Sequence, residues 1–150
     1  MSHSLIIHVS SSLVLENERI TADNLCFDTI QVEIPLMDYF KDSDSLREDD
    51  LKWIGAELAK VGFKLNREEI TMTVDTSFID KWKDATAKAA DEFDLWKMKK
   101  VANGTAFSSM YVYEEENGYP KPLWEWAYDY HTLGKGEVKL YVGGIIDYHF

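Results

Sequence analysis

The sequence contains a single cysteine, few basic residues and no long apolar segment. Because Cys26 stands alone, no intrachain disulfide can form, which fits a reducing cytosol and predicts a cytoplasmic protein. No apolar run approaches the roughly 20 residues that a helix needs to cross a bilayer. Residues 1–9 have neither a basic region nor a long apolar region, so we expect no signal peptide.

Motifs that would fix a chemistry are also missing. The sequence has no glycine-rich phosphate loop, no zinc-ligand spacing and no His-Glu-x-x-His. The three serines at 10–12 lack the flanking glycines of a nucleophile elbow. Cys26 lies beside Phe27, and we expect it to be a small core residue rather than a nucleophile. The sequence therefore predicts no catalytic residue and no cofactor.

The histidines offer the one pattern that resembles a metal site. Residues 129–131 and 147–149 both read Asp-Tyr-His, and in a strand the Asp and His of each would share a face. If the last two strands pair across the turn at 134–136, however, His131 and His149 lie roughly 30 Å apart. We therefore expect no bound metal.

Charge of one sign dominates the composition. The formal net charge is −11, and residues 1–50 alone hold eleven acidic and three basic side chains. Such a surface repels phosphate backbones, so direct binding to nucleic acid or to an anionic membrane is disfavoured. It would attract a basic protein. The alternative is that the acidic residues serve only solubility.

The first third of the chain has the composition of strands. Residues 5–15 and 19–27 are rich in apolar and β-branched side chains. In residues 29–35, Ile30, Val32 and Ile34 alternate with polar residues, which indicates a half-buried strand that ends at Pro35.

Two helices are predicted in the middle of the chain. The first spans about 46–61, with a capping box formed by Ser45 and Glu48 and a left-handed Gly62 at its end. The second spans about 78–102, buries Trp82 and ends at Asn103-Gly104. Residues 70–74 form a short strand between them. Alternatively, Asn103-Gly104 is a hairpin turn that joins strands at 95–101 and 106–111.

The last third holds 11 of the 20 aromatic residues and predicts strands at 106–115, 123–131 and 137–148. Trp124, Trp126, Tyr128 and Tyr130 would share one face of the middle strand, either as core or as an exposed interface. Alternatively, a helix runs from Pro122 through 133 and ends at Gly134. The Gly-Gly pair at 143–144 indicates a bulge or bend.

These patterns predict one α+β domain over residues 1–150. Antiparallel strands from both ends of the chain form its sheet, and the two central helices pack on one face. In charge and size the chain is similar to small acidic inhibitor proteins, including phage anti-restriction and anti-CRISPR proteins and toxin-immunity proteins. That similarity implies a non-enzymatic, nucleic-acid-mimicking inhibitor of a basic, nucleic-acid-binding protein.

Candidate contact residues follow from the same argument. The acidic ones lie in a connection or beside a turn and are not explained by helix capping, and the aromatic ones lie in the tryptophan-rich segment. They are Asp38, Asp42, Asp44, Glu114, Glu115, Glu116, Trp124 and Trp126. One alternative is a small enzyme or ligand-binding protein with a pocket near His131, Asp129 and the aromatic residues. Another is an assembly protein that uses an open sheet edge.

Overall fold

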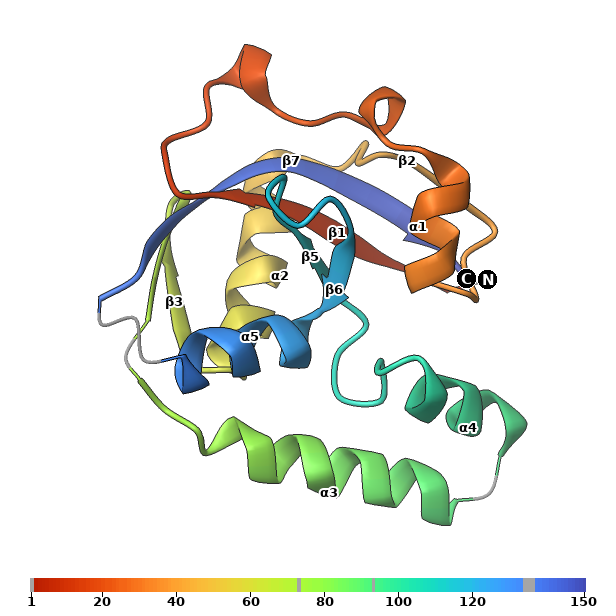
Figure 1. Ribbon diagram of the computed structural model, residues 1–150. Coiled ribbons are helices and arrows are strands. Elements are labelled where there is room, and N and C mark those ends of the chain that lie inside the picture. The colour runs from red at the N-terminus through yellow and green to blue at the C-terminus, as the bar shows by residue number, and fades with distance from the viewer. Residues whose placement is uncertain (1, 73, 93, 134–136) are drawn as a thin grey trace.

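Strand β7 (Lys139–His149) is the centre of a seven-stranded sheet in the computed structural model, which describes residues 2–72, 74–92, 94–133 and 137–150 (Figure 1). One edge of β7 pairs antiparallel with β1 (His3–Ser10). Its other edge pairs with β4 (Glu69–Met72) and β2 (Tyr39–Asp42), which follow one another along it. Strands from the two chain ends thus lie together in one sheet, as the sequence predicted, and they form its middle.

The sheet is mixed, and the prediction of a purely antiparallel sheet is wrong. β1 pairs in parallel with β5 (Tyr111–Tyr113), which in turn pairs antiparallel with β6 (Pro120–Pro122). The full order is β3-β4-β7-β1-β5-β6, with β3 (Phe63–Asn66) at one edge. Parallel neighbours need a long crossover, and the helices of the middle third supply it.

Helices cover both faces of this sheet, not one face as predicted. The larger core packs Leu5, Ile7 and Val9 of β1 against α2 (Arg47–Ala59) and α5 (Leu123–Thr132). The smaller core packs Ile6 of β1 against α1 (Phe27–Glu33). Successive residues of a strand point to opposite faces, so one strand contributes to both cores.

The segment between β1 and β2 contains no strand among its described residues, so the strands predicted at 19–27 and 29–35 are wrong. Short 3-10 turns at Glu16–Glu18 and Ala22–Asn24 precede α1. Ile30 and Ile34 are buried, whereas Val32 is 74% exposed. The alternation that predicted a strand therefore contains an i, i+4 pair that lines one side of a helix.

Helix α2 confirms the helix predicted near 46–61, but its start differs from the predicted capping box. Leu46 is the N-cap residue and makes no side-chain cap bond, and Ser43 Oγ instead donates a hydrogen bond to Asp50 at 2.6 Å. Gly62 has the predicted left-handed geometry, with φ of 80°. Strand β4 confirms the short strand expected near 70–74.

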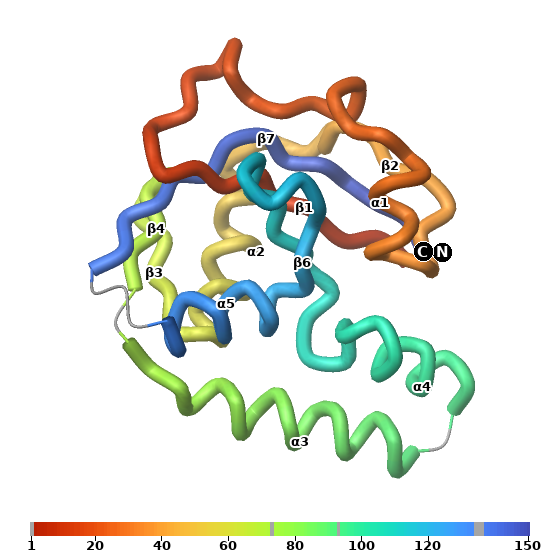
Figure 2. Tube along the Cα trace, viewed as in Figure 1, coloured from red at the N-terminus to blue at the C-terminus, as the bar shows by residue number. Residues whose placement is uncertain are grey.

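The second predicted helix is two helices, α3 (Phe78–Asp91) and α4 (Leu95–Ala102), seen along the lower edge of Figure 2. Asp94 begins α4, where its side chain accepts a hydrogen bond from the backbone N–H of Trp96 at 2.7 Å. The alternative strand at 95–101 is wrong. Trp82 is half-buried and stacks on Trp124, with ring centroids 4.5 Å apart.

Residues 123–132 form helix α5, so the predicted aromatic strand is wrong and its helical alternative is correct. Trp126 and Tyr130 lie four residues apart and pack into the larger core, whereas Tyr128 is exposed. The predicted end of this helix at Gly134 lies outside the described residues. No described helix is both long and apolar enough to cross a membrane.

The bulge predicted at the Gly-Gly pair is confirmed. The register of β1 and β7 passes from Ile7↔Ile145 to Val9↔Val142, so Gly143 and Gly144 together oppose the single residue His8. A Cβ at Gly143 would overlap the His8 ring, and one at Gly144 would overlap the backbone oxygen of Ile20. The glycines thus make room for a buried histidine.

Candidate functional site

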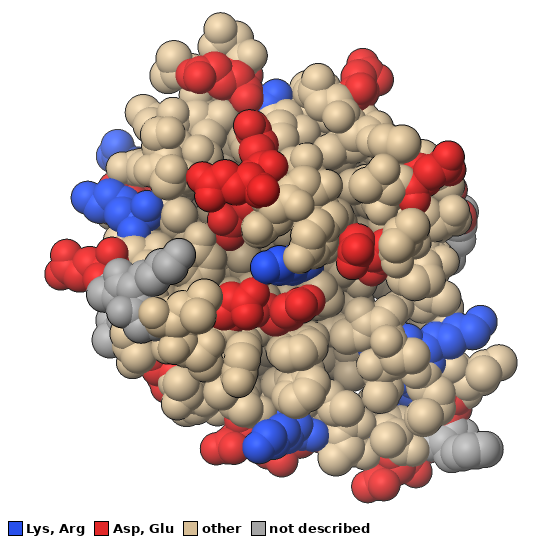
Figure 3. Space-filling view, viewed as in Figure 1, with Lys and Arg blue, Asp and Glu red and all other residues tan. Residues whose placement is uncertain are grey.

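Acidic side chains gather where the parallel strands β1 and β5 reach their carboxyl ends. Glu114, Glu115 and Glu116 directly follow β5, and α5 alongside adds Glu125 and Asp129. We call these five residues the acidic face. Figure 3 shows carboxylates over the β5–β6 turn and α5 with one basic group among them. Doubly wound α/β sheets commonly bind ligands at the carboxyl ends of their parallel strands; in this largely antiparallel sheet β1 and β5 form the one parallel pair among the described strands.

Glu114 is held rigidly by the aromatic residues of α5. Its carboxylate accepts hydrogen bonds from Trp126 Nε1–H and from the Tyr130 hydroxyl, the latter at 3.1 Å. Trp126 is 1% exposed, so it is a core residue and not the exposed contact that the interface hypothesis required. Glu114 therefore lies at the border of the larger core, and its hydrogen bonds fix the position of the acidic turn that follows it.

Glu115 points to the opposite side of the sheet end and approaches His8. Its Oε1 lies 3.3 Å from His8 Nε2, which has no hydrogen-bond partner of good geometry among the described residues. The His8 side chain is 3% exposed, whereas that of Glu115 is 65% exposed. Burial lowers the pKa of His8 below its ordinary value, and the nearby Glu115 only partly offsets this.

Lys121 is the one lysine or arginine between positions 111 and 132, and it is already paired. Its Nζ lies 3.1 Å from Asp129 Oδ2. Burial raises the pKa of Glu125, the ammonium of Lys121 opposes this, and the charges of Asp129 and Glu33 raise it further. The acidic face therefore keeps an excess of negative charge that its own lysine does not neutralise.

Two hollows flank the turn that carries the three glutamates. One, of about 270 Å³, is lined by His8, the serines at 10–12, the glutamates and Tyr130. The other, of about 180 Å³, lies against α5 and is lined by Lys121 and Asp129 as well as Glu114 and Glu116. Each hollow is the size of a side-chain head group rather than of a large cofactor.

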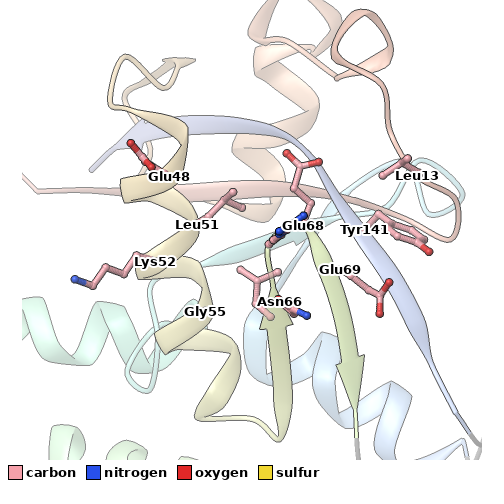
Figure 4. A pocket seen from close by; sticks show the side chains of 11 residues that line it. Leu13, Glu48, Leu51, Lys52, Gly55, Asn66, Glu68, Glu69 and Tyr141 are labelled. Atoms are coloured by element: carbon pink, nitrogen blue, oxygen red, sulfur yellow. The ribbon is translucent and has the colours of Figure 1, made fainter.

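A larger groove of about 1030 Å³ lies between α2 and the β3–β4 hairpin. Figure 4 shows Leu51 pointing from α2 toward the hairpin and Lys52 pointing away from it. Glu68 in this groove is bracketed by Arg47, at 2.7 Å, and Arg19, at 3.4 Å. Arg47 also donates to the backbone oxygen of Val142, so this cluster holds the edge of β7 between β4 and β2. Both acidic and basic side chains line the groove, so it is not an acidic or a basic patch.

The other predicted acidic contacts lie elsewhere. Asp42 is in β2 and Asp38 and Asp44 flank it, and β2 is separated from β5 by β7 and β1. Asp42 accepts a hydrogen bond from the backbone N–H of Ala22 at 2.6 Å, and Asp44 pairs with Lys41 at 3.1 Å. This cluster is therefore not joined to the acidic face, and part of it has a local structural role.

The structure also places the histidines and the cysteine for which the sequence suggested roles. His131 is buried; its Nδ1 accepts from the Asp75 N–H at 3.0 Å and its Nε2 lies 2.6 Å from the Val61 oxygen, so both nitrogens serve the fold. His149 instead lies beside His3, and no group of three described His, Cys, Asp or Glu residues is arranged to hold a metal. Cys26 is exposed, so the prediction that it is a core residue is wrong.

His8 was not among the candidate residues predicted from the sequence. A histidine between Ile7 and Val9 in an apolar strand was the signal that could have found it, because a polar ring there must be buried beside something that accommodates it. Comparisons with known proteins add no candidate, since no family model, curated protein or solved structure matches this chain.

Proposed function

We propose that this protein is a non-enzymatic binder of a basic protein, and that it inhibits that partner by occupying a groove that otherwise binds nucleic acid. The observation that carries the proposal is the acidic face: five carboxylates against one lysine, which is already paired with Asp129. A cytoplasmic location agrees with this role, because nucleic-acid-binding partners are found there.

The electrostatics of the acidic face favour an incoming cation. Burial raises the pKa of Glu125, and the charges of Asp129 and Glu33 raise it further against the opposing ammonium of Lys121, so these carboxylates repel one another in the free protein. A basic partner would relieve this repulsion and would be steered toward the face by its charge. Tyr119 and Tyr128 are 37% and 43% exposed, and they supply aromatic contact area in place of the buried Trp126.

The two alternative functions receive less support. A catalytic pocket at His131 lacks an available nitrogen, because both ring nitrogens have partners in the fold. Assembly through the β6 edge is disfavoured because prolines stand at both ends of this short strand and remove backbone donors.

The test compares two variants that each lose three negative charges. The face variant changes exposed or half-buried members of the acidic face that do not anchor the fold: Glu115→Gln, Glu116→Gln and Glu125→Gln. The control variant changes exposed residues of α3: Asp80→Asn, Asp84→Asn and Asp91→Asn. Their affinities for a nona-arginine peptide are measured at low and high salt.

We expect the parent and the control variant to bind in low salt and to weaken as salt is added, because exposed charges are screened over roughly 8 Å at physiological ionic strength. The face variant should bind about tenfold more weakly, since three surface pairs each contribute up to about 1 kcal/mol. Equal loss in the two variants would mean that only net charge matters and would refute a specific face.

A further inference from the structure

The structure points to a guanidinium site in the hollow at the carboxyl ends of β1 and β5: we propose that Glu115, positioned by His8, receives an arginine side chain of the partner. This inference rests on the proposed function and names the side chain that the acidic face selects. It is carried by a second feature besides acidity, namely a buried histidine whose Nε2 is aimed into the hollow without a well-formed hydrogen bond.

The tautomer of His8 is fixed by the β-bulge. The backbone N–H of Gly144 donates a hydrogen bond to His8 Nδ1 at 3.4 Å, so Nδ1 is the acceptor of a neutral ring. The ring hydrogen then resides on Nε2, which lies 3.3 Å from Glu115 Oε1. His8 thus acts as a positioning residue in this proposal: its neutral Nε2–H attracts the nearby Glu115 carboxylate, although the contact between them is not a well-aligned hydrogen bond.

The other groups around the hollow suit a planar, multiply donating cation. Glu116 and the serines at 10–12 add carboxylate and hydroxyl acceptors, and Tyr130 adds an aromatic wall. A guanidinium presents five donors in a fixed fork, matches a carboxylate with two parallel bonds and stacks on aromatic rings. An ammonium would satisfy fewer of these groups. We therefore expect arginine to be preferred over lysine.

His8 must stay neutral for this arrangement to work. A proton on Nδ1 would face the Gly144 N–H and could not share its hydrogen bond. The resulting imidazolium would also compete with an incoming arginine for the Glu115 carboxylate. Glu115 is the described charged side chain that faces the ring, while the glycines of β7 bring no charge. Acid should therefore weaken arginine binding through His8 before the carboxylates themselves are protonated.

The experiment measures affinity for nona-arginine, nona-lysine and free spermidine in the parent and in single variants. Glu115→Gln removes the proposed receptor charge, and Asp84→Asn on α3 is the matched control. His8→Asn keeps an acceptor for the Gly144 N–H but removes Nε2, whereas His8→Gln offers a donor near the Nε2 position. Melting curves establish that each variant is folded.

We expect Glu115→Gln to bind nona-arginine about tenfold more weakly than Asp84→Asn, because hydrogen bonds to a charged group are among the strong ones. Nona-lysine should bind more weakly than nona-arginine, and spermidine should respond less to Glu115→Gln. His8→Asn should weaken binding at neutral pH and remove the extra loss between about pH 7 and pH 5. His8→Gln should retain more affinity than His8→Asn.

Three outcomes overturn the inference in distinguishable ways. If the parent binds nona-arginine in a salt-dependent manner but Glu115→Gln matches Asp84→Asn, the guanidinium site is wrong while the acidic binder stands. If nona-lysine binds as tightly as nona-arginine, the preference for a guanidinium is wrong. If the parent binds none of the probes, the proposed function falls and the site falls with it.

Discussion

The buried ring of His8 makes folding sensitive to acid. Burial lowers its pKa, so the unfolded chain binds a proton more readily than the folded chain does. The contribution of His8 to stability is complete above its ordinary pKa of about 6.5 and is lost as the pH falls toward the lowered folded value. We predict that the free energy of unfolding decreases from pH 7 to pH 5 more steeply in the parent than in His8→Asn. The free energy of unfolding is measured by urea titration at both pH values. An equal decrease in the parent and in His8→Asn would contradict this prediction.

The two bulge glycines should tolerate no side chain. A Cβ at Gly143 would meet the His8 ring, and one at Gly144 would meet the Ile20 backbone, which cannot move aside as a side chain can. We predict that Gly144→Ala costs about 3 kcal/mol or more, at the upper end of overpacking effects. The control is Gly55→Ala in α2, where the new methyl group meets Leu65 at an ordinary 3.6 Å. It should stabilise the helix by up to about 1 kcal/mol.

At the scale of elements, two of the misassigned segments, 29–35 and 123–131, share one cause. A period-two apolar pattern contains i, i+4 pairs, and these also line one side of a helix. Ile30 in α1 and the C-cap residue Ile34 form such a pair, and Trp126 and Tyr130 form one in α5. The short runs fit both periods, so local sequence could not decide between them. Helix α2 and the Gly143-Gly144 bulge were predictable because the patterns that indicated them, a helical apolar spacing and a Gly-Gly pair within a strand, do not also fit another element.

Trp82, which the sequence predicted to be buried, and Trp126, which it left open between core and interface, should differ in their contributions to stability. Trp126 is 1% exposed and packs against Phe63, with ring centroids 4.6 Å apart, whereas Trp82 is only half-buried on α3. We predict that Trp126→Ala costs about 3–5 kcal/mol and also frees Glu114, while Trp82→Ala costs less. Chemical denaturation of both variants decides this. A larger loss for Trp82→Ala would mean that Trp82, like Phe78 of the same helix, is part of the larger core.

At the scale of the whole molecule, the site could not be read from the sequence because it depends on long-range pairing. His8 meets Glu115 only because β1 pairs in parallel with β5, and nothing in either segment specifies that partner. The sequence did identify Glu114, Glu115 and Glu116 as an acidic cluster beside a turn. It could not show that Glu114 is bound to Trp126 while Glu115 is presented to solvent.

A net charge of −11 also sets a trade-off between binding and stability. The carboxylates of the acidic face repel one another, so removing them should stabilise the free protein. We predict that the face variant (Glu115→Gln, Glu116→Gln and Glu125→Gln) melts at a temperature equal to or above that of the parent in low salt. Added salt should narrow the difference, since it screens the repulsion. A lower melting temperature for this variant would show that these residues serve the fold.

Competition with nucleic acid tests the central claim most directly. The parent and the face variant are immobilised and exposed to a cell lysate in low salt, and the retained proteins are then challenged with duplex DNA. If the acidic face occupies a nucleic-acid-binding groove, the parent alone should retain basic proteins, and added DNA should release them. Retention of the same proteins by both columns, with no release by DNA, would contradict the account.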